Sequence, residues 1–104
     1  MATYYQARDG RKFNTEREAI AYNTALSGLS EENNGKYYEA IVYYTDAIDS
    51  FPHYPYTNDL HYAYLMRART YLKIGDWEKA ETDVEGVLNY GRNGGVIYGE
   101  KEAL

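Results

Sequence analysis

The residues best suited to bind a metal ion lie near the middle of the chain. His53 and His61 are its two histidines, and Asp49 and Asp59 lie close to them in sequence. Imidazole and carboxylate groups are common zinc ligands. These residues surround a predicted loop, however, and lack the two-histidines-per-helix spacing that would define a coordination geometry. Solvated loop histidines are the simpler interpretation, and we expect no metal site and no cofactor.

No other arrangement of residues indicates catalysis. The chain contains no cysteine, which excludes a thiolate nucleophile and a disulfide. There is no G-x-S-x-G motif. The glycine-rich segment at residues 91–95 neither follows a predicted strand nor carries the Lys-Ser/Thr pair of a phosphate-binding loop. We therefore expect no enzymatic activity.

A basic cluster near the N-terminus suggests a binding surface of another kind. It consists of Arg8, Arg11, Lys12 and Arg17, and it could meet an acidic partner or nucleic acid. A solvated charged face is the alternative. The formal net charge of −5 argues against general binding to nucleic acid or to an anionic membrane, since both require a basic surface.

The predicted compartment is the cytoplasm. No run of 18 apolar residues could cross a membrane. Residues 1–14 lack the apolar core and the small-residue cleavage pattern of a secretion signal.

The first predicted element is a short β-hairpin over residues 3–13. Asp9 and Gly10 favour a two-residue turn, because both residue types tolerate positive φ. A helix is predicted over residues 16–32, where Thr15 and Glu18 have the spacing of a capping box. The Asn-Asn-Gly-Lys sequence at residues 33–36 ends this helix.

A second helix is predicted from the spacing of its apolar residues. Steps of three and four place one set of side chains on a single helical face. The set is Tyr37, Ala40, Ile41, Tyr44, Ala47, Ile48 and Phe51. Tyr38 and Tyr43 lie off this face. Pro52 and Pro55 end the helix.

Two further helices complete the predicted fold. One runs from Asp59 or Leu60 to Ile74, and the next from Trp77 to near Tyr90. A short last helix is expected in the tail, although Gly99 interrupts it. We predict a single mainly α domain, comprising a β-hairpin (1–14), a first helix hairpin (15–52), a loop (53–58), a second helix hairpin (59–91) and a tail (92–104).

The chain contains an internal repeat, in which residues 28–48 match residues 68–88. The matching positions are Gly28 with Ala68, Gly35 with Gly75, Tyr37 with Trp77, Ala40 with Ala80, Tyr44 with Val84, Ala47 with Val87, and Ile48 with Leu88. Small residues mostly match small ones and large match large, as two stacked helix hairpins require.

This pattern resembles the tetratricopeptide repeat family. Residues 21–54 match its pattern at Gly28, Gly35, Tyr37, Ala40, Tyr44, Ala47 and Pro52, and residues 61–94 at Tyr64, Ala68, Tyr71, Gly75, Trp77 and Ala80. The sequence departs from the pattern at Thr24, Glu31, Val87 and Arg92, and six extra residues separate the units. The resemblance implies a fragment of a right-handed solenoid. A plain helical bundle whose hairpins match by chance is the alternative.

The resemblance also implies a function and a site. Members of the family bind peptides along the inner faces of the first helix of each unit, so we expect a non-enzymatic protein-binding module, an adaptor or assembly subunit. The corresponding residues are Tyr22, Ala25, Leu29, Glu32 and Asn33 in the first unit and Tyr62, Leu65, Arg69, Leu72 and Lys73 in the second. Of these, the predicted peptide-binding residues are Tyr22, Leu29, Tyr62, Leu65, Arg69 and Lys73. The two cations suit an extended acidic peptide. Packing of these side chains on a neighbouring helix or a second chain is the alternative.

Two repeats leave exposed flanks, because stacked repeats usually need at least three units. The hairpin and the tail could cover these flanks, or two chains could stack. Tyrosine is enriched at interfaces, so Tyr38, Tyr43, Tyr54 and Tyr56 favour a homodimer. Two other functions remain open: an accessory protein that contacts nucleic acid through the basic hairpin, and a self-assembling structural protein.

Overall fold

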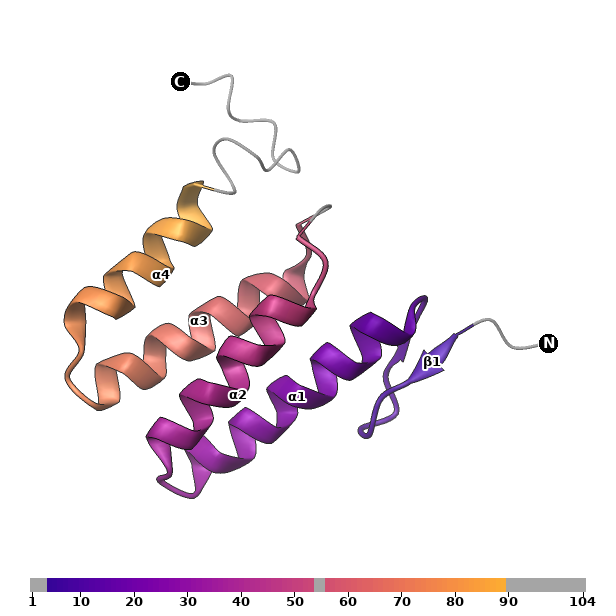
Figure 1. The fold of residues 1–104 in the computed structure, drawn as a ribbon, viewed down its shortest axis with the longest axis horizontal. Helices are drawn as coiled ribbons and strands as arrows, with labels where there is room; N and C mark the ends of the chain where they lie inside the picture. Colours follow the sequence, from indigo (N-terminus) through magenta and orange to yellow (C-terminus); the bar gives the residue numbers. More distant parts are fainter. Residues whose placement is uncertain (1–3, 54–55, 90–104) are drawn as a thin grey trace.

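The computed structural model describes residues 4–53 and 56–89. Its elements are β1 (Tyr5–Gln6), β2 (Lys12–Phe13), α1 (Glu16–Asn33), α2 (Tyr37–Ser50), α3 (Asn58–Lys73) and α4 (Trp77–Asn89) (Figure 1). The mainly helical class and the N-terminal β-hairpin are confirmed. Tyr54 and the tail, where a last helix is predicted, lie outside the described residues.

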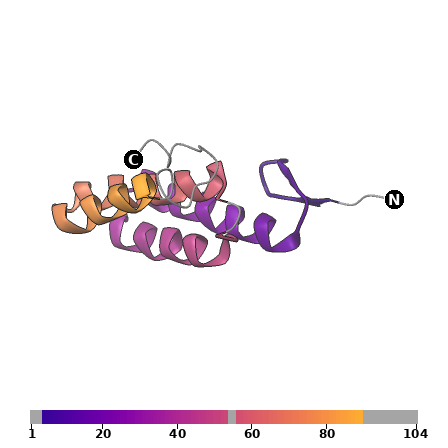
Figure 2. The same cartoon turned by 90° about the horizontal axis from the view of Figure 1, so that it is seen from above.

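The elements follow one another in order (Figure 1), and the array that they form is flat (Figure 2). Helices α1 and α2 form one antiparallel hairpin, and α3 and α4 form the next, with α3 packed against α2. Seen from the side, the β-hairpin lies beyond α1 at one end, and α4 lies at the other end (Figure 2). None of the helices in the described ranges is long and apolar enough to cross a membrane.

The turn of the β-hairpin differs from the predicted two-residue turn. Gly10 has a φ of +95°, whereas Asp9 keeps a negative φ. The Gly10 amide donates to the Ala7 carbonyl (2.9 Å), and the Ala7 amide donates to the Arg11 carbonyl (2.7 Å). Residues 8–10 therefore form a three-residue loop, which needs a left-handed conformation only at its last position.

The ends of the helices follow the local signals in the sequence. The Thr15 hydroxyl accepts a hydrogen bond from the Glu18 amide (3.2 Å), as predicted for the first cap. The Glu18 carboxylate accepts from the Thr15 hydroxyl instead of capping a backbone amide (3.0 Å). Gly35 and Gly75 both have a φ of +80°, beyond the ends of α1 and α3. The two helix hairpins thus turn in the same way, at matching positions of the repeat.

The core is formed mainly by small side chains and a few large ones. Its main cluster consists of Ala21, Ala25, Ala47, Ile48, Phe51, Tyr56, Leu60 and Ala63. Tyr44 and Ala40 are also fully buried, which confirms the predicted packing face of α2. Tyr38 and Tyr43 are exposed, as their positions off this face indicate.

Candidate functional site

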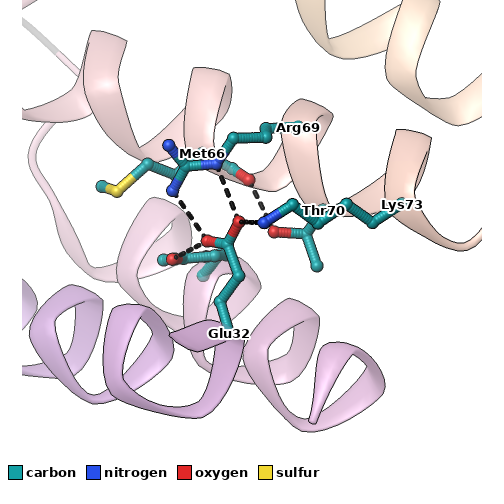
Figure 3. A network of polar contacts seen from close by, with 6 residues as sticks. Glu32, Met66, Arg69, Thr70 and Lys73 are labelled. Atoms are coloured by element: carbon teal, nitrogen blue, oxygen red, sulfur yellow. Dashed lines mark hydrogen bonds and ion pairs between the residues drawn. The ribbon is translucent and has the colours of Figure 1, made fainter. Parts of the chain in front are cut away.

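A buried carboxylate, Glu32, lies where the first three helices meet (Figure 3). It is near the C-terminal end of α1 and only 3% exposed. The Arg69 guanidinium donates to both of its oxygens (2.7 and 2.8 Å), and the Lys73 ammonium donates to Oε2 (2.8 Å). The Tyr44 hydroxyl donates to Oε1 (2.7 Å). One carboxylate thereby joins α1 to both α2 and α3.

The surroundings of Glu32 favour its charged form. Burial alone would raise its pKa, but the hydrogen bonds from Arg69, Lys73 and Tyr44 outweigh burial and lower the pKa to about 2. Burial and the neighbouring Glu32 carboxylate both raise the pKa of Tyr44. Tyr44 therefore remains a hydrogen-bond donor and Glu32 an acceptor at neutral pH.

This network changes the interpretation of two predicted peptide-binding cations. Arg69 and Lys73 already hold an intramolecular carboxylate, although their side chains remain 50% and 40% exposed. With two cations and one carboxylate, the cluster presents one net positive charge. One signal in the sequence could have indicated this pairing: a carboxylate stands at Glu32, whereas Leu72 stands at the matching position of the second unit.

A second network joins the last three helices. Arg67 donates to both carboxylate oxygens of Asp83 (2.9 and 2.6 Å) and to the Thr45 hydroxyl (3.1 Å). Asp83 is buried in α4. Burial of both charges is tolerated because the planar guanidinium satisfies both carboxylate oxygens. The sequence alone does not indicate this network.

A pocket of about 290 Å³ lies between α1 and α3. It is lined by Arg11, Tyr22, Ala25, Phe51, Asp59, Tyr62 and Met66. The structure thus brings together Tyr22 and Tyr62, which the family resemblance placed on one face. The other predicted groove residues, Leu29 and Leu65, are partly buried and do not line this pocket.

The β-hairpin supplies one wall of this pocket. Arg11 donates to both oxygens of Asp59 at the start of α3 (2.6 and 2.9 Å), and its guanidinium lies 5.1 Å from the centre of the Tyr22 ring. The Tyr22 hydroxyl donates to Asp9 (2.6 Å), which lowers the pKa of Asp9. Four pocket residues were not predicted from the sequence: Arg11, Phe51, Asp59 and Met66. Their proximity depends on where the hairpin packs and on how α3 stacks against the first helix hairpin.

Two other arginines of the basic cluster attach the hairpin to α1 and α1 to the end of α2. Arg8 donates to the Asn23 carbonyl (2.6 Å), and Arg17 donates to the Ser50 carbonyl. The Lys12 ammonium lies 4.6 Å from the centre of the Tyr4 ring. The three arginines are therefore engaged within the chain.

The tyrosines predicted for self-association do not form one surface in the described part of the chain. Tyr56 is buried in the core, so its ring offers little area to a second chain. Tyr38 and Tyr43 are both on α2 but lie about 140° apart around the helix axis at 3.6 residues per turn. Tyr54 is outside the described residues.

The two histidines contact groups other than the aspartates close to them in sequence. His53 Nε2 is 2.8 Å from the Ile48 carbonyl oxygen, and His61 Nδ1 is 3.1 Å from the Tyr56 hydroxyl. Asp59 is paired with Arg11. Within residues 4–53 and 56–89, no group of three or more His, Cys, Asp or Glu side chains could hold a metal ion.

The fold and the pocket define a mainly helical domain of two antiparallel helix hairpins with a β-hairpin packed on the first helix. Comparison of the chain with models of protein families, with curated proteins and with solved structures gives no match in any of the three.

Proposed function

We propose that the protein is a non-enzymatic protein-binding module whose α1–α3 face holds an extended peptide. The pocket between α1 and α3 is the observation that carries this proposal. The lining of the pocket is mainly aromatic and aliphatic, with two charged residues, Arg11 and Asp59, as is usual for sites that bind a side chain of a ligand. Its two tyrosines come from corresponding positions of the two helix hairpins.

The tetratricopeptide resemblance supports the same proposal. We interpret the two helix hairpins as degenerate units of that family. Helices α2 and α4 begin at Tyr37 and Trp77, and the left-handed glycines before them are Gly35 and Gly75, so the internal repeat is present in the structure as well as in the sequence. In such units the peptide lies along the first helices, here α1 and α3.

An acidic peptide fits this face best. Beyond Tyr62, helix α3 presents Met66 and then Arg69 and Lys73, whose cluster with Glu32 has one net positive charge. A peptide with an apolar side chain in the pocket and a carboxylate a few residues away would contact both regions.

Selection from a phage-displayed library of random peptides tests this function. We expect enriched peptides to carry an aromatic or aliphatic residue near acidic residues, and to lose at least tenfold in affinity on Tyr62→Ala or Met66→Ala. Tyr38→Ala on α2 is the matched control and leaves binding unchanged. Peptides whose affinity is insensitive to Tyr62 and Met66 would place the binding site elsewhere.

Self-association is the second candidate, favoured by one exposed patch. Tyr38 is 70% exposed and Val42 59% exposed, and they are adjacent on the outer face of α2. Light scattering over a wide concentration range measures the molar mass. A dimer that Tyr38→Glu dissociates would support this candidate, whereas a monomer at all concentrations would exclude it.

A further inference from the structure

An apolar groove lies on the last helix hairpin, between α3 and α4. Its volume is about 420 Å³, and it is lined by Ala68, Leu72, Trp77, Ala80, Glu81 and Val84. The Trp77 side chain is 68% exposed, and Leu72 and Val84 are 46% and 40% exposed. The exposed Leu88 continues the same side of α4. These side chains expose far more apolar surface than the isolated exposed residues that are normal on proteins.

The internal repeat allows this groove to be compared with the equivalent region of the first helix hairpin. The matching positions on the first hairpin include Glu32, Tyr44 and Ile48. All three are buried, and Arg69 and Lys73 of α3 bind Glu32. The first hairpin is thus covered by a following helix. On the second hairpin the buried carboxylate is replaced by Leu72, so the groove suits an apolar helix face.

Charge at the edge of the groove indicates the kind of helix. Glu78, Glu81 and Glu85 are exposed and lie along one side of the apolar strip of α4, within about 100° of Trp77 around the helix axis. The one basic residue of α4, Lys79, lies away from the strip, near Asp76 (3.7 Å). The α4 side of the groove is therefore acidic.

The contact between α2 and α3 provides a template for this edge. On the first hairpin, Arg67 of α3 donates to Thr45 of α2 (3.1 Å). Glu85 occupies the position of the repeat that matches Thr45. A docked helix with a cation at the position that corresponds to Arg67 would therefore place this cation beside the Glu85 carboxylate. The resulting charge-assisted hydrogen bond would be stronger than the bond from Arg67 to the Thr45 hydroxyl.

We propose that the α3–α4 groove docks a basic amphipathic helix of a partner protein. Small and aliphatic side chains of that helix pack on Leu72, Trp77 and Val84, and its lysines or arginines face Glu81 and Glu85. This groove lies between a different pair of helices from the peptide pocket between α1 and α3. The two binding proposals can therefore be tested separately, and the failure of one does not contradict the other.

Two other occupants fit the observations less well. Two copies joined through the same groove would bring their glutamates together, and a head-to-tail contact would meet the β-hairpin at the far end of the array (Figure 2). The short helix predicted in the tail follows Gly91, Gly94 and Gly95 and is interrupted by Gly99, so the sequence offers fewer consecutive helix-forming residues there than a docked helix of a partner would.

Trp77 is the only tryptophan of the chain, so its fluorescence reports directly on the groove. The probe is a synthetic amphipathic helix of leucine and lysine, and the control peptide has glutamate in place of lysine. We expect the lysine peptide to shift the Trp77 emission to shorter wavelength in a saturable manner, and the glutamate peptide to have no effect. Val84→Lys weakens binding at least tenfold, whereas Ile20→Lys, at an exposed position of α1, leaves it unchanged. Glu81→Lys with Glu85→Lys reverses the preference between the two peptides.

Four results would overturn the proposal. The first is no shift with the lysine peptide, and the second is an equal shift in the Val84→Lys variant. The third is a shift of the Trp77 emission to shorter wavelength when the protein concentration is raised without any peptide, together with a doubled molar mass. This result would show that a second copy of the chain occupies the groove. The fourth is a shift to longer wavelength on truncation after Asn89, which would assign it to residues 90–104.

Discussion

At the scale of single residues, each helix hairpin pairs a small residue on its first helix with a larger one on its second helix, and the pairs differ in size. A Cβ atom added at Gly28 would lie 2.7 Å from Cε1 of Tyr44, so the large buried ring requires glycine opposite it. In the second hairpin, Ala68 is found with the smaller Val84. The size of one side chain thus limits the size of the side chain opposite it, because protein interiors are close-packed.

The first prediction concerns this pair. Gly28→Ala lowers the free energy of unfolding by about 1–3 kcal/mol, because the tightly packed ring of Tyr44 must shift. Gly86→Ala is the matched control: no atom lies within 4 Å of its added Cβ, so we expect it to stabilise α4 by about 0.5–1 kcal/mol. Urea denaturation measures both, and a neutral Gly28→Ala would refute the close approach of α1 and α2.

The second prediction concerns pH. The folded-state pKa of Glu32, about 2, lies below its ordinary value of 4.5. Its ion pairs therefore contribute stability above pH 4.5 and lose it as the pH falls toward about 2. In Glu32→Gln the free energy of unfolding at neutral pH is lower, and its fall over this pH range is smaller. Glu39→Gln, an exposed carboxyl on α2, is the control, and identical pH profiles for wild type and Glu32→Gln would contradict the prediction.

At the scale of elements, α3 holds the array together. Its Arg69 and Lys73 bind Glu32 of α1, its Arg67 binds Thr45 of α2 and Asp83 of α4, and its Asp59 binds Arg11 beside β2. Each contact is an ion pair or a charge-assisted hydrogen bond between elements. The alanine-rich core supplies little large apolar surface, so we interpret these pairs as fixing the order and register of the helices.

The third prediction tests the pair between α3 and α4. Arg67→Met leaves Asp83 buried without its cation, and we expect a loss of about 3–5 kcal/mol. The double variant Arg67→Met with Asp83→Leu recovers most of the loss, because it removes the buried charge as well. In the single variant, the backbone amides of α4 should exchange with solvent faster than those of the other helices. If the double variant is as unstable as the single one, the cause is lost packing and not the unpaired carboxylate.

At the scale of the whole molecule, the β-hairpin closes the end of the array beside α1 (Figure 2). Phe13 is buried against the Tyr22 ring, with 5.2 Å between ring centres, and the arginines of the basic cluster bind acceptors within the chain. Asp59 therefore neutralises Arg11, whereas the neutral acceptors of Arg8 and Arg17 hold these side chains in place without removing their charge, in a chain of net charge −5.

The fourth prediction follows for nucleic acid. We expect no retention on immobilised duplex DNA or RNA at low ionic strength, because too few cations are available to displace phosphate counterions. A salt-gradient elution measures this. Retention that falls steeply with salt, and that Lys12→Glu weakens while the exposed Lys36→Glu does not, would instead support an accessory nucleic-acid-binding role.

Local signals in the sequence were enough to predict where the helices lie and which face of α2 is buried. These signals are the cap of Thr15, the glycines at residues 35 and 75, and apolar spacing near the period of a helix. The same signals revealed the internal repeat. They were not enough to predict the turn at Asp9 and Gly10, because the register of two short strands depends on how the hairpin packs against α1.

The pairing of charges, in contrast, became visible only in the tertiary structure. Glu32 and Lys73 are 41 residues apart, and Arg11 and Asp59 are 48 apart. Their pairing depends on how the helices stack, because a long side chain on a helix surface could equally face solvent or a partner. For the same reason, only the packed helices show that Arg69 and Lys73 hold an internal carboxylate, while the strip from Trp77 to Leu88 stays exposed.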